Sequence, residues 1–177
     1  MCHPHQTMKV LCPDESHLHS RARKSKSTHS LLPKLILVPC DFSDCSIAAL
    51  AQAAALAKLT GGTLVLLHVI EPVTPGFLTE GTVSRQTQGL LREKAGQKLA
   101  PQAKTHASGV HLGRPLIKAG KPWEVIVSTA SKGGADLIVL GPHGYTGLKH
   151  AVLGSVAERV VRHAPCPVLV VRAKSKR

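Results

Sequence analysis

The feature that most constrains this fold is a regular alternation of short apolar runs and helical patterns across residues 34–171. Five runs have the length and composition of strands: 35–39, 63–70, 111–119, 136–140 and 168–171. Helical patterns separate them at 44–59, 84–107, 122–133 and 155–163. Alternating elements of this kind pair their strands in parallel, with right-handed crossovers. The sequence therefore predicts an α/β fold: an open, doubly wound, five-stranded parallel sheet with helices on both faces.

Local signals set the ends of several elements. Ser43 has the residue type of an N-cap, and Gly61-Gly62 ends the helical pattern that follows it. The run at 111–119 is less regular than the others, because Gly113 and Pro115 interrupt it. Proline cannot donate to a strand ladder, so we expect this run at an edge of the sheet.

A glycine-punctuated segment directly follows the run at 136–140. Gly141, Gly144, Gly154 and Ser155 are spaced as G-x2-G-x9-G-S, and a helical pattern begins at Ser155. Glycines let backbone N–H groups approach phosphate oxygens closely, and a helix N-terminus adds a partial positive charge. The segment is predicted to be a phosphate-binding loop, although the glycines alone would also suit a tight turn.

Asp41 is the candidate partner of this loop. In doubly wound sheets ligands bind beyond the carboxyl ends of the strands, where the strand order reverses. If the runs at 35–39 and 136–140 are neighbours there, the loops that follow them face each other. Asp41 is then expected opposite Gly141 and Gly144. Without that context, Asp41 would suit an ordinary turn or helix cap equally well.

Together these segments resemble the ATP-binding branch of the universal stress protein family, over about residues 33–172. The family's phosphate motif, G-x2-G-x9-G-[S/T], is matched at every fixed position by Gly141, Gly144, Gly154 and Ser155. Four further segments resemble the family's strands and final helix: 37–43, 66–70, 154–160 and 165–171. The resemblance implies the sheet order 3-2-1-4-5, with a nucleotide pocket between the first and fourth strands.

The resemblance also implies ATP, with Mg²⁺, as the ligand. Asp41 matches the family residue that bonds the ribose hydroxyls. Three positions match those lining the adenine, and one matches an apolar position against the base: Pro39, Cys40, Val69 and, against the base, Leu140. Backbone atoms of six residues would hold the phosphates: Gly141, His143, Gly144, Gly154, Ser155 and Val156. A homodimer is implied through the last strand, which presents an apolar edge: Val168, Leu169, Val170 and Val171.

Catalytic groups are scarce around this pocket. Asp41 is its one carboxylate, and it is expected at the ribose end, away from the terminal phosphate. No Walker-type G-x4-G-K-[S/T] occurs in the chain, because Gly120-Lys121 is followed by Pro122. We therefore expect a nucleotide-dependent stress-response sensor or adaptor, with unidentified protein partners and little or no hydrolysis. A weak ATPase or self-phosphorylating enzyme is one alternative. A purely structural binding module, whose pocket is empty or takes another adenine nucleotide, is a second.

The net charge of +13 raises a third alternative, a polyanion binder. More than half of this excess lies in residues 1–30 and 172–177, outside the periodic region, and the chain has few aromatic side chains for stacking on bases. Specific nucleic-acid recognition is not indicated. We expect a basic, histidine-rich extension over 1–32, the domain over 33–172 and a basic tail over 173–177. An odd number of cysteines and no apolar run of membrane-spanning length favour the cytoplasm, without a membrane partner.

Overall fold

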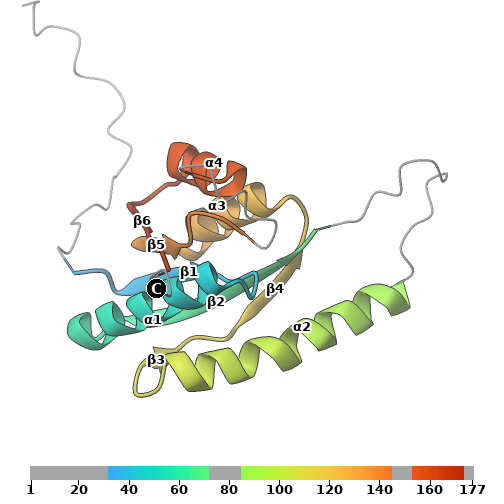
Figure 1. Ribbon diagram of the computed structural model, residues 1–177, viewed down its shortest axis with the longest axis horizontal. Coiled ribbons are helices and arrows are strands. Elements are labelled where there is room, and N and C mark those ends of the chain that lie inside the picture. The colour runs from blue at the N-terminus through green and yellow to red at the C-terminus, as the bar shows by residue number, and fades with distance from the viewer. Residues whose placement is uncertain (1–31, 72–84, 145–152, 174–177) are drawn as a thin grey trace, which may run out of the picture.

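The computed structural model describes residues 32–71, 85–144 and 153–173 (Figure 1). Its elements, in chain order, are β1 (Leu35–Pro39), α1 (Asp44–Thr60), β2 (Thr63–Ile70), α2 (Arg85–His106), β3 (His111–Leu112), β4 (Leu116–Ala119), α3 (Pro122–Gly133), β5 (Leu137–Leu140), α4 (Ser155–His163) and β6 (Val168–Val170). The expected N-terminal extension and C-terminal tail lie almost entirely outside the described residues.

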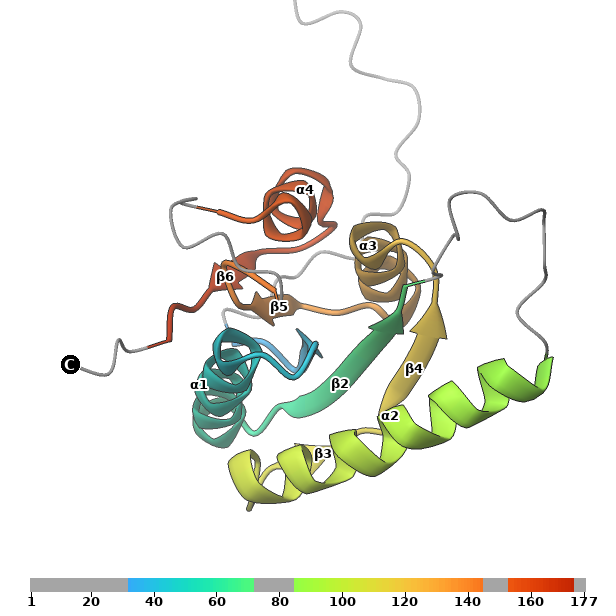
Figure 2. The same cartoon turned by 45° about the vertical axis from the view of Figure 1, so that its right-hand side comes forward.

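All strand pairs of the sheet are parallel, and the strand order is β3-β2-β1-β5-β6. β4 pairs with the far end of β2, along the same side of that strand as β3 (Figure 2). The predicted doubly wound sheet and its order are confirmed, with β3 and β4 together in the place of the predicted third strand.

The third strand differs from the prediction in being divided. Gly113 and Pro115 lie between β3 and β4, and a Cβ added at Gly113 would lie 2.7 Å from Cγ2 of Val65. Gly113 N still donates to the Leu64 carbonyl oxygen of β2 at 2.9 Å, but Pro115 has no N–H to donate, so the ladder is interrupted before β4 begins. The described residues therefore form six strand segments where the periodicity predicted five.

Side chains of the central strands alternate between two core layers. Ile36 and Val38 of β1 pack in the layer that contains α1 and Leu99 of α2. Leu37, between them, packs in the layer that contains Ile126 of α3 and residues of α4. α1 and α2 thus cover one face of the sheet and α3 and α4 the other, as Figure 2 shows. Burial on both faces explains why the strands read as continuous apolar runs.

Helix ends follow the local chemistry of the sequence. The Ser43 hydroxyl accepts a hydrogen bond from Ser46 N, as an N-cap of α1, and Gly61 ends the helix in a left-handed conformation with φ of 66°. Pro122 opens α3, and Gly134 closes it at φ of 65°. Because these signals act within one helical turn, the sequence predicted them well.

Candidate functional site

The candidate site lies where β1 and β5, neighbours at the centre of the sheet, reach their carboxyl ends. Their pairing joins Ile36 to Leu137 and Leu37 to Ile138, so the turns that follow both strands emerge side by side. A Cβ added at Gly144 would lie only 2.8 Å from Oδ2 of Asp41. The expected meeting of Asp41 with Gly144, across about a hundred residues of chain, is therefore present.

The Asp41 carboxylate has a fixed orientation at the start of α1. Its Oδ1 accepts hydrogen bonds from the Ser43 hydroxyl at 2.6 Å and from the Ser43 backbone N–H at 3.1 Å. Ser43 in turn accepts from Ser46 N, so the helix cap and the carboxylate form one connected group. With Oδ1 held in this way, Oδ2 is the oxygen on the Gly144 side.

Gly141 has a different neighbour from the one expected. A Cβ added there would meet Cys45 of α1, at 2.7 Å from its Cβ and 3.0 Å from its carbonyl carbon. Gly141 thus brings the β5 loop into direct contact with the first turn of α1. Its partner is this turn, whereas Gly144 is the glycine beside the Asp41 carboxylate.

The two ends of the glycine loop are joined to each other. Gly154 N donates to the Pro142 carbonyl oxygen at 2.7 Å. A Cβ at Gly154 would lie 3.0 Å from that oxygen and 3.5 Å from Nδ1 of His143. Residues 145–152 lie outside the described part of the chain, but the bond brings the glycines of both ends together at one place.

α4 begins at this junction. Gly154 is its N-cap and has an extended backbone, and no side chain caps the helix there. The first N–H groups of an α-helix have no partner within the helix, so this end carries a partial positive charge and donors for an anion. Ser155 and Val156, both predicted phosphate-binding residues, are the first two residues of α4.

The predicted adenine positions have backbone groups that the protein itself already uses. Cys40 N donates to the Leu67 carbonyl oxygen at 2.8 Å, and the Cys40 carbonyl oxygen accepts from His68 Nδ1 at 2.8 Å. Pro39 has no N–H. The backbone N–H of Cys40 is thus unavailable to a base, and its carbonyl keeps only its second lone pair.

Two of the side chains at these positions, Cys40 and Leu140, are buried, one on each face of the sheet. Cys40 is 3% and Leu140 4% exposed. The Cys40 side chain packs in the layer that contains α1, whereas Leu140 and Val69 pack in the layer that contains α3 and α4. Removal from water raises the pKa of the Cys40 thiol, which therefore stays protonated and unreactive at neutral pH.

Two residues near the site connect it to other elements. His68, on β2, holds the Cys40 carbonyl as described above. Phe42 has a φ of 68° and contacts the His68 ring. Sequence reasoning missed Phe42, because nothing in its residue type indicates a left-handed backbone.

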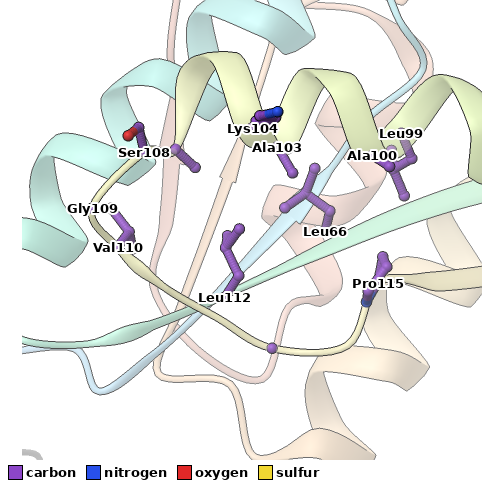
Figure 3. Close-up of a pocket in the computed structure, with 12 residues that line it drawn as sticks. Leu66, Leu99, Ala100, Ala103, Lys104, Ser108, Gly109, Val110, Leu112 and Pro115 are labelled. Atoms are coloured by element: carbon purple, nitrogen blue, oxygen red, sulfur yellow. The ribbon is translucent and has the colours of Figure 1, made fainter.

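A separate hollow, the α2 cavity, has a volume of about 450 Å³ (Figure 3). It lies between the second half of α2 and the sheet, and Ala103 and Leu66 point toward each other across it in the figure. Its lining residues are Leu66, Leu99, Ala100, Ala103, Lys104, Ala107, Ser108, Gly109, Val110, Leu112, Gly113 and Pro115. None of the predicted nucleotide-binding residues is among them.

Residues 32–71, 85–144 and 153–173 include no helix long and apolar enough to cross a membrane. Within the same ranges, no three histidine, cysteine or carboxylate side chains come together as a metal site would require.

Comparison with known proteins agrees with this architecture. The model of the universal stress protein family matches residues 33–172. Universal stress protein MJ0531 of Methanocaldococcus jannaschii is 40% identical over 149 residues, covering 82% of this chain and 85% of that protein. The chain belongs to the universal stress protein family.

Solved structures show the same fold. That of protein MJ0577, from the same archaeon, is 35% identical and superimposes with a TM-score of 0.71, covering 82% of this chain and 99% of that one. A universal stress protein of Archaeoglobus fulgidus, solved in complex with dAMP, is 25% identical with a TM-score of 0.54, covering 79% and 98%.

Proposed function

We propose that this chain binds ATP beyond the carboxyl ends of β1 and β5 and acts as a nucleotide-dependent sensor or adaptor in a stress response. One observation carries the proposal: an oriented carboxylate, Asp41, lies directly against Gly144, beside a loop that leads to an uncapped helix N-terminus. A carboxylate can accept hydrogen bonds from two ribose hydroxyls, and a helix N-terminus suits phosphates. The relative solved with dAMP supports an adenine nucleotide as the ligand class.

The residues would divide the nucleotide among them. Asp41 would bind the ribose, because Oδ2 is the carboxylate oxygen on the Gly144 side. Backbone groups at the loop ends and the first turn of α4 would hold the phosphates: Gly141, His143, Gly144, Gly154, Ser155 and Val156. A Cβ at Gly144 would lie 2.8 Å from Oδ2 of Asp41, so any side chain there would crowd the carboxylate.

Mg²⁺ would enter with the phosphates. The described residues hold no cluster of three metal-ligating side chains, so phosphate oxygens and water would supply most of the coordination. When bound, the ion neutralises phosphate charge. For hydrolysis a base must reach a water near the terminal phosphate. Asp41 is held by Ser43 in a position suited to ribose, so we propose binding with little or no turnover.

The sensor role would work through linkage. A ligand that binds one arrangement of the loop ends more tightly shifts the population of molecules toward that arrangement. This shift would change the surface formed by 141–144 and 153–156, which a partner protein would contact.

Homodimerisation through β6 is part of the proposal. β6 pairs with β5 on one side, and no other described strand pairs with it. Its side chains are half-buried, and an apolar edge of this kind favours strand pairing across a two-fold axis. Val170→Lys should convert a dimer to a monomer in sedimentation velocity, and an unchanged sedimentation coefficient would contradict this interface.

Thermal unfolding with Mg-ATP tests the nucleotide site. At about 100 times its dissociation constant, a ligand adds roughly 2.7 kcal/mol to the free energy of unfolding. We expect this stabilisation with ATP and less with GTP. The stabilisation by AMP, dAMP and cyclic AMP shows which parts of the nucleotide contribute to binding. Measured release of ADP from the same samples would reveal the alternative, a weak ATPase.

Two alanine variants locate the binding site. Gly144→Ala should abolish the stabilisation, because its Cβ would lie 2.8 Å from Asp41 Oδ2. Gly89→Ala is the matched control, since nothing lies within 4 Å of a Cβ there. An equal ATP response in both variants would reject the site.

A further inference from the structure

Phe42 is the one non-glycine residue with a positive φ among the described residues, at 68°. It stands between Asp41, which faces Gly144, and Ser43, which caps α1. A bulky residue rarely adopts a left-handed backbone, and such strain persists only where the surroundings impose it. The hydrogen-bonded carboxylate of the site is thus next to its most unusual backbone conformation.

Two elements outside the turn hold the Phe42 ring. The ring of His68, on β2, lies 4.6 Å from it between centroids, tilted by 39°. The Nζ atom of Lys98, on α2, lies 5.8 Å from the ring centroid, within the range of a cation–π contact. The ring also packs against the core layer that contains α1. Phe42 therefore joins the turn to β2 and α2.

The neighbours of Phe42 are held as well. On the preceding side, His68 Nδ1 donates to the Cys40 carbonyl oxygen at 2.8 Å. On the following side, the Ser43 hydroxyl and N–H both donate to Asp41 Oδ1. The Ser43 N–H turns back to the carboxylate two residues earlier, with the left-handed Phe42 between them.

We infer that Phe42 is a positioning residue for the ribose end of the nucleotide site. Its left-handed backbone directs Asp41 Oδ2 toward Gly144, and its ring, held by His68 and Lys98, keeps the turn in that conformation. This inference rests on the proposed nucleotide binding and deepens it. Phe42 sets how strongly the site distinguishes a nucleotide with ribose hydroxyls from one without them.

The ratio of two dissociation constants, for Mg-ATP and for Mg-2′,3′-dideoxy-ATP, measures this effect by calorimetry on the full chain. A hydrogen bond to a charged group changes affinity by about tenfold or more, so wild type should prefer ATP by at least that factor. A purely structural role for Phe42 would weaken both nucleotides together and leave the ratio unchanged.

Two variants at this position separate the effect of the Phe42 backbone conformation from the effect of its ring contacts. Phe42→Gly and Phe42→Val both lose the ring contacts, but only glycine adopts a positive φ without strain. The glycine variant should keep most of the preference for ATP. The valine variant should bind both nucleotides within about twofold of each other. Retention of the wild-type ratio in the valine variant would overturn the inference.

If the valine variant fails to fold, Lys98→Met tests the positioning role of Phe42 instead. It keeps an unbranched side chain on α2 and removes only the charge above the Phe42 ring. We expect a ratio lowered about two- to fivefold, while Lys94→Met, an equally exposed lysine one turn earlier on the same helix, leaves the ratio unchanged. An unchanged ratio in Lys98→Met would count against the inference.

Wild type itself separates this inference from the proposed function. If it binds ATP and dideoxy-ATP equally, nucleotide binding stands and the positioning role of Phe42 is wrong. If it binds neither nucleotide, the proposed function fails, and the ribose role fails with it.

Discussion

The glycine-loop site and the α2 cavity both contain small residues, yet they are packed in opposite ways. At the loop site, a Cβ added to Gly141 would lie within 3 Å of Cys45 in α1, and one added to Gly144 would lie within 3 Å of the Asp41 carboxylate. At the α2 cavity, small side chains leave a hollow of about 450 Å³: Ala100, Ala103 and Ala107. A small residue can thus mark either a close approach or an unfilled space.

The difference arises from what each helix contributes to the core. α1 buries four alanines and a leucine against the sheet: Ala49, Leu50, Ala53, Ala54 and Ala57. α2 is longer, but Leu99 is its one large, fully buried side chain among the described residues. In Figure 2, α2 crosses below β2, β3 and β4 at the edge of the sheet, whereas α1 lies under its centre. The loop site is therefore built on the more closely packed part of the fold.

The largest expected effect tests the close approach at Gly141. Gly141→Ala should destabilise the fold by about 1–3 kcal/mol, because its Cβ would meet the backbone carbonyl carbon of Cys45 at 3.0 Å. Urea denaturation measures the change. Gly144→Ala should destabilise less, since its neighbour is the end of the Asp41 side chain. Equal stabilities of the two variants would remove the distinction between these glycines.

A matched pair of leucine substitutions compares the two helices directly. Ala53→Leu, at a position of α1 with 0% exposure, should cost about 1–3 kcal/mol through overpacking. Ala103→Leu, whose side chain would enter the α2 cavity, should stabilise by about 0.5–2 kcal/mol. Thermal unfolding reports both. If both variants are destabilised alike, the α2 cavity is already filled and the comparison breaks down.

Alkaline pH should lower the free energy of unfolding of the protein through Cys40, the buried thiol that precedes Asp41 of the loop site. Burial raises the pKa of Cys40 in the folded protein, whereas in the unfolded chain a thiol titrates near about 8.5. Below that pH both states hold the proton, so there is no dependence. Above it the unfolded chain loses the proton first, and the free energy of unfolding falls by at most about 1.4 kcal/mol per pH unit.

Cys40→Ala provides the control for this pH dependence, measured by denaturation between pH 7 and 10. The variant should show a smaller fall in stability with pH. Some fall should remain, because burial also raises the pKa of Cys166. An identical slope in wild type and Cys40→Ala would show that the thiol ionises without cost in the folded state.

The smallest expected effect concerns the first half of α2. Gly89 is an exposed helical glycine with nothing within 4 Å of an added Cβ. Gly89→Ala should stabilise by about 0.5–1 kcal/mol through helix propensity alone. Gly113→Ala, where a Cβ would lie 2.7 Å from Cγ2 of Val65, should do the reverse. Chemical denaturation of both variants distinguishes a glycine with open space around it, Gly89, from a glycine packed against a neighbouring strand, Gly113.

Much of the fold was predictable because its signals are local or periodic. Continuous apolar runs indicated strands buried on both faces, and Ser43 and Gly61 set the ends of α1. The division of the third strand at Gly113 and Pro115 was only partly foreseen. An edge strand was expected from the proline, but the length of the gap depends on how closely the chain passes Val65.

The site was predictable where topology alone decides it. Once β1 and β5 are neighbours, Asp41 must come near the glycine loop, and it lies against Gly144. Three other features had no signal in the residues: the contact of Gly141 with Cys45, the use of both Cys40 backbone groups within the protein, and the left-handed backbone of Phe42. Each depends on atoms of an element distant in sequence.

By itself, the sequence determined the alternation of strands and helices, the strand order implied by the family resemblance, and the pairing of an acidic turn with a glycine loop. Hydrophobic periodicity and capping act over a few residues, so they can be read along the chain. Only the tertiary structure decided which small residues lie in close contact and which leave a cavity. A glycine or alanine reads the same in the sequence whether it lies in close contact or beside a cavity. Only its distance to the neighbouring element distinguishes the two cases.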